Sequence, residues 1–306
     1  MPSFRVFQTF LAVVKHGTFA AAGKEIGLTA AAVGLQIRLL EEDLNQVLFD
    51  RGARSVVLNT TGRRIAAQIE DLMLRYEALA VVGDTDELSG TVVMGALVSA
   101  LMGAFADALW SLKRAHPRLE VKLLAGLSSD FTVKVERGEL DAAVVAQSPR
   151  PLPSSLVWTP LYDEPMVLIV PRHPHFDLAR DPLEILRRCP FLRFDRQTWT
   201  GYLVKDVLRQ CGVAVREEME LNSVEAIVEI VRQGFGISIV PRLANVDWLN
   251  DQGLRAISLP GTDVQRHVGL IERTHHGRQR FSNEIKLYFQ TNKLKKRQKS
   301  GRGKEN

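Results

Sequence analysis

The stretch that decides the fold is residues 18–51, TFAAAGKEIGLTAAAVGLQIRLLEEDLNQVLFDR, which predicts two short helices joined by a glycine turn. Thr18 is a good N-cap for the first helix, expected over residues 19–26, and Gly27 supplies the left-handed backbone at its end. Thr29 can cap the second helix, whose apolar residues recur every three or four positions and bury one face. A corner with an exposed second helix is the geometry that enters the major groove of DNA.

Residues 18–51 alone do not distinguish a DNA-binding helix-turn-helix from an ordinary helical hairpin. The flanking segments favour the DNA-binding motif. Residues 4–14 carry an apolar helical stripe that would complete a three-helix core. Residues 47–51 and 55–58 predict two short strands around the tip Gly52-Ala53-Arg54, the pattern of a wing. Residues 1–60 therefore predict an all-α winged helix-turn-helix domain.

The order FQTFLAVVKHGTFAAAGKEIGLTAAAV, IRLLEEDL, LFDR and LNTTGR resembles the N-terminal domain of LysR-type transcriptional regulators, a bacterial family. The resemblance is close over residues 3–66, and the rest of the chain follows the family's plan with weaker motifs. It implies a regulator that binds double-stranded promoter DNA and responds to a small-molecule effector. It also implies a dimer or a tetramer made of two dimers, and contact with RNA polymerase if the protein is an activator.

Residues 61–90 predict a long helix followed by a hinge. Thr60 can cap a helix from about residue 62 to residue 82, and GDTDELSG at residues 83–90 has the composition of a linker. The helix carries more apolar side chains than a lone connector can leave in water. In line with the family, we expect it to form a dimer interface. These side chains are Ile65, Ile69, Leu72, Leu74, Tyr76 and Leu79.

Residues 91–292 alternate strands and helices, which predicts an α/β fold for this part and for the chain overall. We expect two lobes joined by two crossings with a cleft between them, an effector domain that resembles periplasmic ligand-binding proteins. Lobe I would comprise about residues 91–161 and 265–292, and lobe II about residues 162–264. Closure around a ligand is the motion that such a shape permits.

Candidate effector-binding residues lie where strands end and helices begin in both lobes. In open α/β sheets these helix starts supply N–H donors and a positive dipole, so together they suit a small carboxylate or a similar anion. Phe194 and Trp199 could add an apolar wall, and the family resemblance favours Ser99 and Ser128. The alternative is that the polar residues are only helix caps. The candidates are Ser99, Ser128, Ser129, Phe194, Trp199, Thr200, Asn222 and Ser223, with Thr198 as a further cap.

Candidate DNA contacts divide into those to phosphates and those to bases. Arg51 and Arg54 on the wing, and Thr29 with the backbone N–H groups at the start of the second helix, suit phosphates. Base reading would fall to Gln36 or Arg38, because arginine can pair with guanine and glutamine with adenine.

The second helix departs from the family at positions that usually carry polar side chains. Ala30, Ala31 and Gly34 stand there, and none of them can donate a side-chain hydrogen bond to a base. A glycine inside a helix costs about 1 kcal/mol against alanine. We therefore hypothesise a close approach of backbone to DNA at Gly34, with thymine-methyl contacts by Ala30, Ala31 and Leu35 and more indirect readout. The alternative is a regulator with relaxed specificity.

Cysteine content, apolar runs and motifs exclude several classes of protein. Cys189 and Cys211 have no disulfide or zinc spacing, and no apolar run approaches the ~20 residues of a membrane helix. With no signal peptide we expect a cytoplasmic protein that does not contact the membrane. Seven scattered histidines and the lack of phosphate-loop or hydrolase motifs predict no catalytic residue, cofactor or metal. The remaining rival is a small-molecule-binding protein whose N-terminal helices serve dimerisation alone.

The net charge of +5 is concentrated at one end of the chain. The segment 293–306, KLKKRQKSGRGKEN, holds seven lysines and arginines against one glutamate, so residues 1–292 are close to neutral. Its composition predicts a disordered basic tail. Such a tail either adds nonspecific, salt-sensitive DNA affinity or is solvated without a partner.

Overall fold

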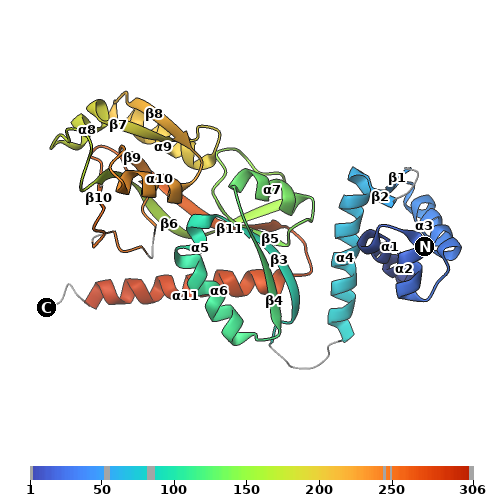
Figure 1. The fold of residues 1–306 in the computed structure, drawn as a ribbon. Coiled ribbons are helices and arrows are strands. Elements are labelled where there is room, and N and C mark those ends of the chain that lie inside the picture. Colours follow the sequence, from blue (N-terminus) through green and yellow to red (C-terminus); the bar gives the residue numbers. More distant parts are fainter. Residues whose placement is uncertain (1–2, 52–55, 81–86, 244–245, 249, 303–306) are drawn as a thin grey trace. The chain divides into compact units, whose positions relative to one another are not determined.

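The computed structural model describes residues 3–51, 56–80, 87–243, 246–248 and 250–302 (Figure 1). The chain divides into two units, one formed by residues 1–86 with residues 136–139 and 275–277, and the other by the rest of the chain. The predicted fold class is confirmed, because a helix-turn-helix unit precedes a mixed α/β unit.

The N-terminal unit follows the predicted order of elements closely. The Thr18 and Thr29 hydroxyls accept hydrogen bonds from the amides of Ala21 and Ala32, each at 3.2 Å, and Gly27 has a φ of 71°. The two caps and the glycine turn thus fix the corner as expected. The elements are α1 Phe4–His16, α2 Phe19–Ile26, α3 Ala30–Leu44, β1 Phe49–Arg51, β2 Val56–Leu58 and α4 Thr60–Ala80.

The cap of α4 differs from the prediction. Asn59 takes the place expected for Thr60, because its Oδ1 accepts from the Gly62 amide at 2.8 Å while its Nδ2 donates to the Val47 carbonyl. One asparagine therefore closes the start of α4 and ties it to the chain before β1. Gly62 is required here, since a Cβ would lie 2.0 Å from the Leu48 carbonyl oxygen. The antiparallel β1–β2 pair forms the predicted wing, whose tip at residues 52–55 lies outside the described residues.

The C-terminal unit is built on a seven-stranded mixed sheet in the order β10-β6-β11-β5-β3-β4, with β9 also paired to β6. A separate parallel pair, β7–β8, belongs to lobe II. The strands are β3 Gly90–Ala96, β4 Leu119–Ala125, β5 Ala142–Ala146, β6 Leu156–Pro171, β7 Pro190–Phe194, β8 Arg216–Leu221, β9 Ser238–Pro241, β10 Leu254–Ile257 and β11 Gln265–Arg273. The helices are α5 Val98–Leu101, α6 Ala104–Ala115, α7 Ser128–Glu136, α8 Pro182–Arg188, α9 Trp199–Cys211, α10 Val224–Arg232 and α11 Gln279–Arg302.

The two lobes share one long strand where the sequence predicted a break. We expected the first strand of lobe II at residues 166–170, but β6 runs without interruption over 16 residues (Figure 1). Its first part pairs with β11, and its last part pairs with β9 and β10. The expected division of the lobes at residues 161 and 162 therefore falls inside one strand. Within this strand Pro160 pairs with Gly269, next to a bulge in the β6–β11 ladder.

Four further differences concern three stretches of helix and one strand. The helix expected from Ser99 to residue 115 is two helices, α5 and α6, because Gly103 has a non-helical backbone. Helix α8 and strand β10 were not predicted. The basic segment expected to be disordered continues α11 as far as Arg302, in keeping with the good helix propensity of lysine, arginine and glutamine. Residues 303–306 lie outside the described residues.

Each lobe has its own apolar core. Phe105, Leu119 and Val144 are buried in lobe I, and Leu168, Phe191 and Ile239 are buried in lobe II. In the described part of the chain, β6 runs from lobe I into lobe II and β11 returns to lobe I, so the lobes can pivot about these strands while both cores stay intact. No described helix combines the length and apolar character needed to cross a membrane.

Candidate functional site

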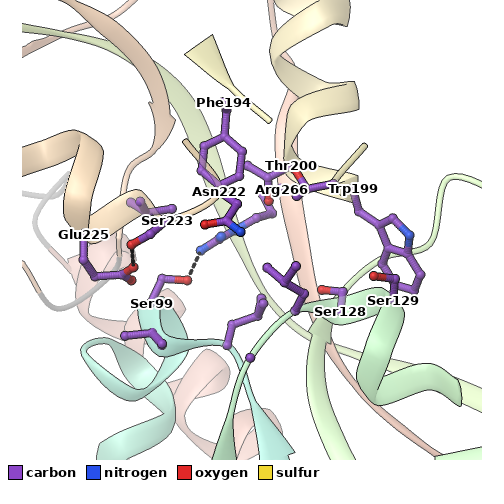
Figure 2. Close-up of a pocket in the computed structure, with 16 residues that line it drawn as sticks. Ser99, Ser128, Ser129, Phe194, Trp199, Thr200, Asn222, Ser223, Glu225 and Arg266 are labelled. Atoms are coloured by element: carbon purple, nitrogen blue, oxygen red, sulfur yellow. Dashed lines mark hydrogen bonds between the residues drawn. The ribbon is translucent and has the colours of Figure 1, made fainter. Parts of the chain in front are cut away.

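A cavity of about 270 Å³ lies between the two lobes of the C-terminal unit. Residues from lobe I reach it at the ends of β3 and β4, and residues from lobe II reach it at the ends of β7 and β8 (Figure 2). All eight predicted effector-binding residues line it: Ser99, Ser128, Ser129, Phe194, Trp199, Thr200, Asn222 and Ser223. The structure therefore brings together side chains that are separated by more than one hundred positions in the sequence.

The lobe II helix starts are capped as the sequence predicts. The Thr198 hydroxyl accepts from the Gly201 amide at 3.0 Å and begins α9. The Ser223 hydroxyl accepts from the Ala226 amide at 3.1 Å and begins α10. These caps satisfy one amide each, so the other first-turn amides of α9 remain as potential donors at the cavity.

The lobe I serines do not act as helix caps, which corrects the sequence prediction. Ser99 lies inside the short helix α5, is 3% exposed, and its hydroxyl accepts from Arg266 Nη2 at 3.0 Å. The Ser128 hydroxyl accepts from the Ala146 amide of β5 at 3.1 Å. A serine hydroxyl has one proton to donate in addition to its acceptor sites. Each serine can therefore still donate a hydrogen bond to a ligand.

Arg266 is one of the residues lining this cavity that sequence reasoning missed. It lies on β11, is 1% exposed, and pairs with Glu164 on the neighbouring strand β6, which is fully buried. Nε of Arg266 donates to Glu164 Oε2 at 2.8 Å, and Nη2 donates to the same oxygen and to Ser99. A signal was present in the sequence, because Arg266 shares one face of its strand with Val268 and Leu270, which are buried.

Burial raises the pKa of the Tyr162 phenol, the nearby Glu164 carboxylate adds to the rise, and Arg266 partly opposes it. The phenol therefore stays neutral across the physiological range. The Arg266–Glu164 pair supplies a hydrogen-bonding guanidinium to the cavity wall with little net charge.

Trp199 connects the lobes at one side of the cavity. It begins α9 in lobe II but packs against the lobe I cluster that includes Phe131 and Ile271. The buried Phe194 ring also lines the cavity. The cavity thus combines an apolar lining with a few convergent polar groups, the usual character of a small-molecule site.

In the N-terminal unit, α3 presents an exposed face of the predicted composition. Its buried stripe is Val33, Ile37 and Leu40. On the outer side, Leu35 is 57% exposed, and Thr29, Ala30, Ala31 and Arg38 are exposed as well. Of the wing residues, Arg51 lies in β1 and Arg54 lies outside the described residues.

Gln36 is turned toward α1 rather than toward the outer face. Its amide Oε1 position lies 2.6 Å from the hydroxyl of Thr9, which is fully buried and also donates to the Arg5 carbonyl at 2.9 Å. One hydroxyl proton cannot serve both acceptors. The amide is therefore best oriented with its NH₂ group donating to Thr9. Of the two alternatives for base reading, Gln36 is held against Thr9 and Arg38 is exposed, and base reading by either residue stays a prediction.

Replacing Gly34 by alanine is expected to stabilise the N-terminal unit by about 0.5–1 kcal/mol. A Cβ at this position would lie 3.6 Å from the Phe19 ring, an ordinary van der Waals distance, so packing does not require glycine. Urea unfolding of the full chain measures the gain. If the backbone at Gly34 approaches DNA closely, the same variant binds its operator more weakly. A stable variant with unchanged operator affinity would reject that hypothesis.

Comparison with known proteins identifies both units. A family model described as "Bacterial regulatory helix-turn-helix protein, lysR family" matches residues 4–63, and one described as "LysR substrate binding domain" matches residues 85–283. A relative from Cyanophora paradoxa, named "Probable RuBisCO transcriptional regulator", is 31% identical over 94% of this chain and 92% of its own length. A relative from Mycobacterium leprae, named "Probable hydrogen peroxide-inducible genes activator", is 27% identical over 90% of each protein.

Solved structures share the fold at lower identity. A full-length OxyR variant from Pseudomonas aeruginosa superimposes with a TM-score of 0.69 at 20% identity, covering 94% of each chain. Full-length CbnR in complex with its target DNA superimposes with a TM-score of 0.55 at 19% identity, covering 94% of this chain and 99% of that one. The chain belongs to the LysR family of bacterial transcriptional regulators, with a helix-turn-helix DNA-binding domain followed by a substrate-binding domain.

Proposed function

We propose that this regulator reads an interrupted inverted repeat in promoter DNA, and that a small organic acid bound between its lobes changes how it does so. The observation that carries the proposal is the convergence of the eight predicted residues and Arg266 on one cavity. At about 270 Å³ the cavity is at the small end of the range for ligand sites, so the effector is a small metabolite.

We propose an acidic effector because hydrogen-bond donors line the cavity. They are the Ser128 hydroxyl, the Arg266 guanidinium, and the first-turn amides of α7 and α9, whose dipoles favour negative charge. Trp199 and Phe194 cover the carbon skeleton of the ligand. Donors fixed by a fold cost little reorganisation when an anion arrives.

DNA binding is assigned to α3 and the wing, with Arg38 as the principal base reader and the start of α3 on the phosphates. We further propose a dimer formed through α4. Its Ile69 and Met73 are buried in the core of the N-terminal unit, while Leu72 and Tyr76 are 43% and 53% exposed. The Tyr76 ring stacks on Phe4 with centroids 4.1 Å apart, which extends this apolar surface. Promoter DNA as the ligand makes the cytoplasm the proposed site of action.

The effector acts by population shift in this scheme. A ligand held by both lobes favours the lobe arrangement in which its contacts are complete, and only this difference in affinity can change DNA binding. Strands β6 and β11 are the elements about which the arrangement changes.

A thiol-based peroxide sensor is the second candidate, suggested by the name of the Mycobacterium leprae relative. The positions of the two cysteines oppose it. Cys189 is 1% exposed in the core of lobe II, Cys211 packs beside that core, and neither lines the cavity. Burial raises the pKa of both thiols, so the reactive thiolate is scarce near neutral pH.

Footprinting of the purified full chain on the DNA upstream of its own gene, across a salt series, tests the proposal. Protection of several helical turns that survives moderate salt is the expected result. Titration of a panel of small organic acids should then change the footprint, and Ser128→Ala should weaken that response. Hydrogen peroxide is the control and should change nothing. Diffuse protection that vanishes with salt would instead favour a small-molecule-binding protein without specific DNA recognition.

A further inference from the structure

We infer that the effector carries a hydrogen-bond donor, a hydroxyl or ammonium group, which Glu225 accepts at the end of the cavity opposite Trp199. This inference rests on the proposed binding of a small acid in the same cavity. Glu225 lies in the first turn of α10 and lines the cavity. It was not among the residues predicted from the sequence.

The two oxygens of Glu225 have different surroundings. Oε2 accepts from the Ser223 hydroxyl at 2.6 Å. Oε1 is shielded from water and has no hydrogen-bond partner among the described residues. A buried carboxylate oxygen without a partner costs free energy, and such groups are rare in folded proteins. Glu225 lines the cavity, so a change of its side-chain rotamer that brings Oε1 to the cavity surface would let a donor on the bound ligand satisfy this oxygen.

The Ser223 hydroxyl already uses its only proton and one acceptor site in this arrangement. Its oxygen accepts from the Ala226 amide and its only proton goes to Glu225, so it has no proton left for the acid group of an effector. The Glu225 carboxylate would also repel a second carboxylate placed at the start of α10. The acid group of the effector must therefore bind elsewhere in the cavity.

Figure 2 shows the residues that would face the two ends of the effector. Glu225 and Ser223 are at one side of the cavity, Ser128, Ser129 and Trp199 are at the other, and Arg266 lies between them. An acid group held by Arg266, Ser128 and α7 leaves the opposite end of the molecule facing Glu225. The ligand class is then a small hydroxy acid or amino acid, rather than a plain carboxylic acid or a diacid.

Isothermal titration calorimetry of the purified full chain with four probes tests the inference. The probes are benzoate, para-hydroxybenzoate, para-(aminomethyl)benzoate and benzylamine. They supply an acid alone, an acid with a hydroxyl, an acid with an ammonium, and an ammonium alone. Glu225→Gln removes the negative charge, and Glu225→Asp keeps the charge but shortens its reach. Glu229→Gln is the matched control, because Glu229 lies on α10, pairs with Arg232 and does not line the cavity.

We expect the two donor-bearing acids to bind the native chain at least about tenfold more tightly than benzoate. Glu225→Gln should remove the advantage of the ammonium and reduce that of the hydroxyl, and Glu229→Gln should change neither. Equal binding of benzoate and its derivatives, or an unchanged ranking in Glu225→Gln, would overturn the inference and leave the proposed acid site standing. Glu225-dependent binding of benzylamine without binding of any acid would overturn the acid site and keep the inference. Binding of none of the probes would overturn both.

Discussion

Replacement of Arg266 by methionine is expected to lower the free energy of unfolding of the C-terminal unit by about 3–5 kcal/mol. The substitution removes the counter-charge of Glu164, which is fully buried, and also takes away the donor to Ser99. Urea unfolding of the full chain, followed by tryptophan fluorescence, measures the loss. A loss under about 1 kcal/mol would mean that Glu164 is stabilised by other groups.

The double variant Arg266→Met with Glu164→Leu separates stability from ligand binding. Replacing both members of a buried ion pair by apolar residues of similar size is often neutral or stabilising, so we expect most of the lost stability to return. The response of the footprint to small acids should not return, because the guanidinium at the cavity wall is still absent. A double variant that regains both would show that Arg266 supports the fold without contacting the effector.

Replacement of Arg38 by alanine is expected to weaken binding to the operator by about 1–3 kcal/mol, roughly 5- to 150-fold. Arg38 is exposed on α3, whereas Gln36 is held by Thr9, so loss of Arg38 would remove the base-edge donor that we propose for this helix. Fluorescence anisotropy with operator DNA and with a scrambled duplex, at one fixed salt concentration, measures the discrimination between them.

Arg64→Ala is the control for the Arg38 variant, since Arg64 is an exposed arginine on α4. It should change binding to the operator and to the scrambled duplex by the same factor, if at all. If Arg38→Ala behaved in that way too, Arg38 would be a phosphate contact. Specificity would then rest on the shape of the DNA and on methyl contacts along α3.

Local features of the fold could be predicted because each depends on a few adjacent residues. The caps Thr18 and Thr29 and the turn at Gly27 act within three or four positions of themselves, and their helices begin and end where expected. Helix α8 was missed although Asp181 followed by Pro182 is a good helix start, and the Asp181 carboxylate does cap it. The continuity of β6 was missed because it depends on pairing with strands that lie far away in the sequence, namely β11, β9 and β10.

The cavity residues likewise divide into those that the neighbouring sequence predicts and those that the fold brings together from distant positions. Ser99, Ser128, Thr200 and Asn222 could be placed from the general rule that ligands bind where strands end. Arg266 and Glu164 are 102 positions apart, and no spacing motif relates them. The negative charge that Glu225 places at the cavity was also missed. In the sequence, Glu225 is an ordinary carboxylate in the first turn of a helix, and only the fold shows that it lines the cavity.

The path of the chain through the sheet also constrains how the protein is made. Strand β5 is buried along its whole length, and its neighbour on one side, β11, is synthesised about 120 residues later. At the pace of bacterial translation this is a delay of roughly ten seconds. During that interval lobe II can finish folding while the apolar edge of β5 waits without its partner. Newly made chains therefore pass through a stage in which the unpaired edge of β5 is a specific segment that a chaperone could bind.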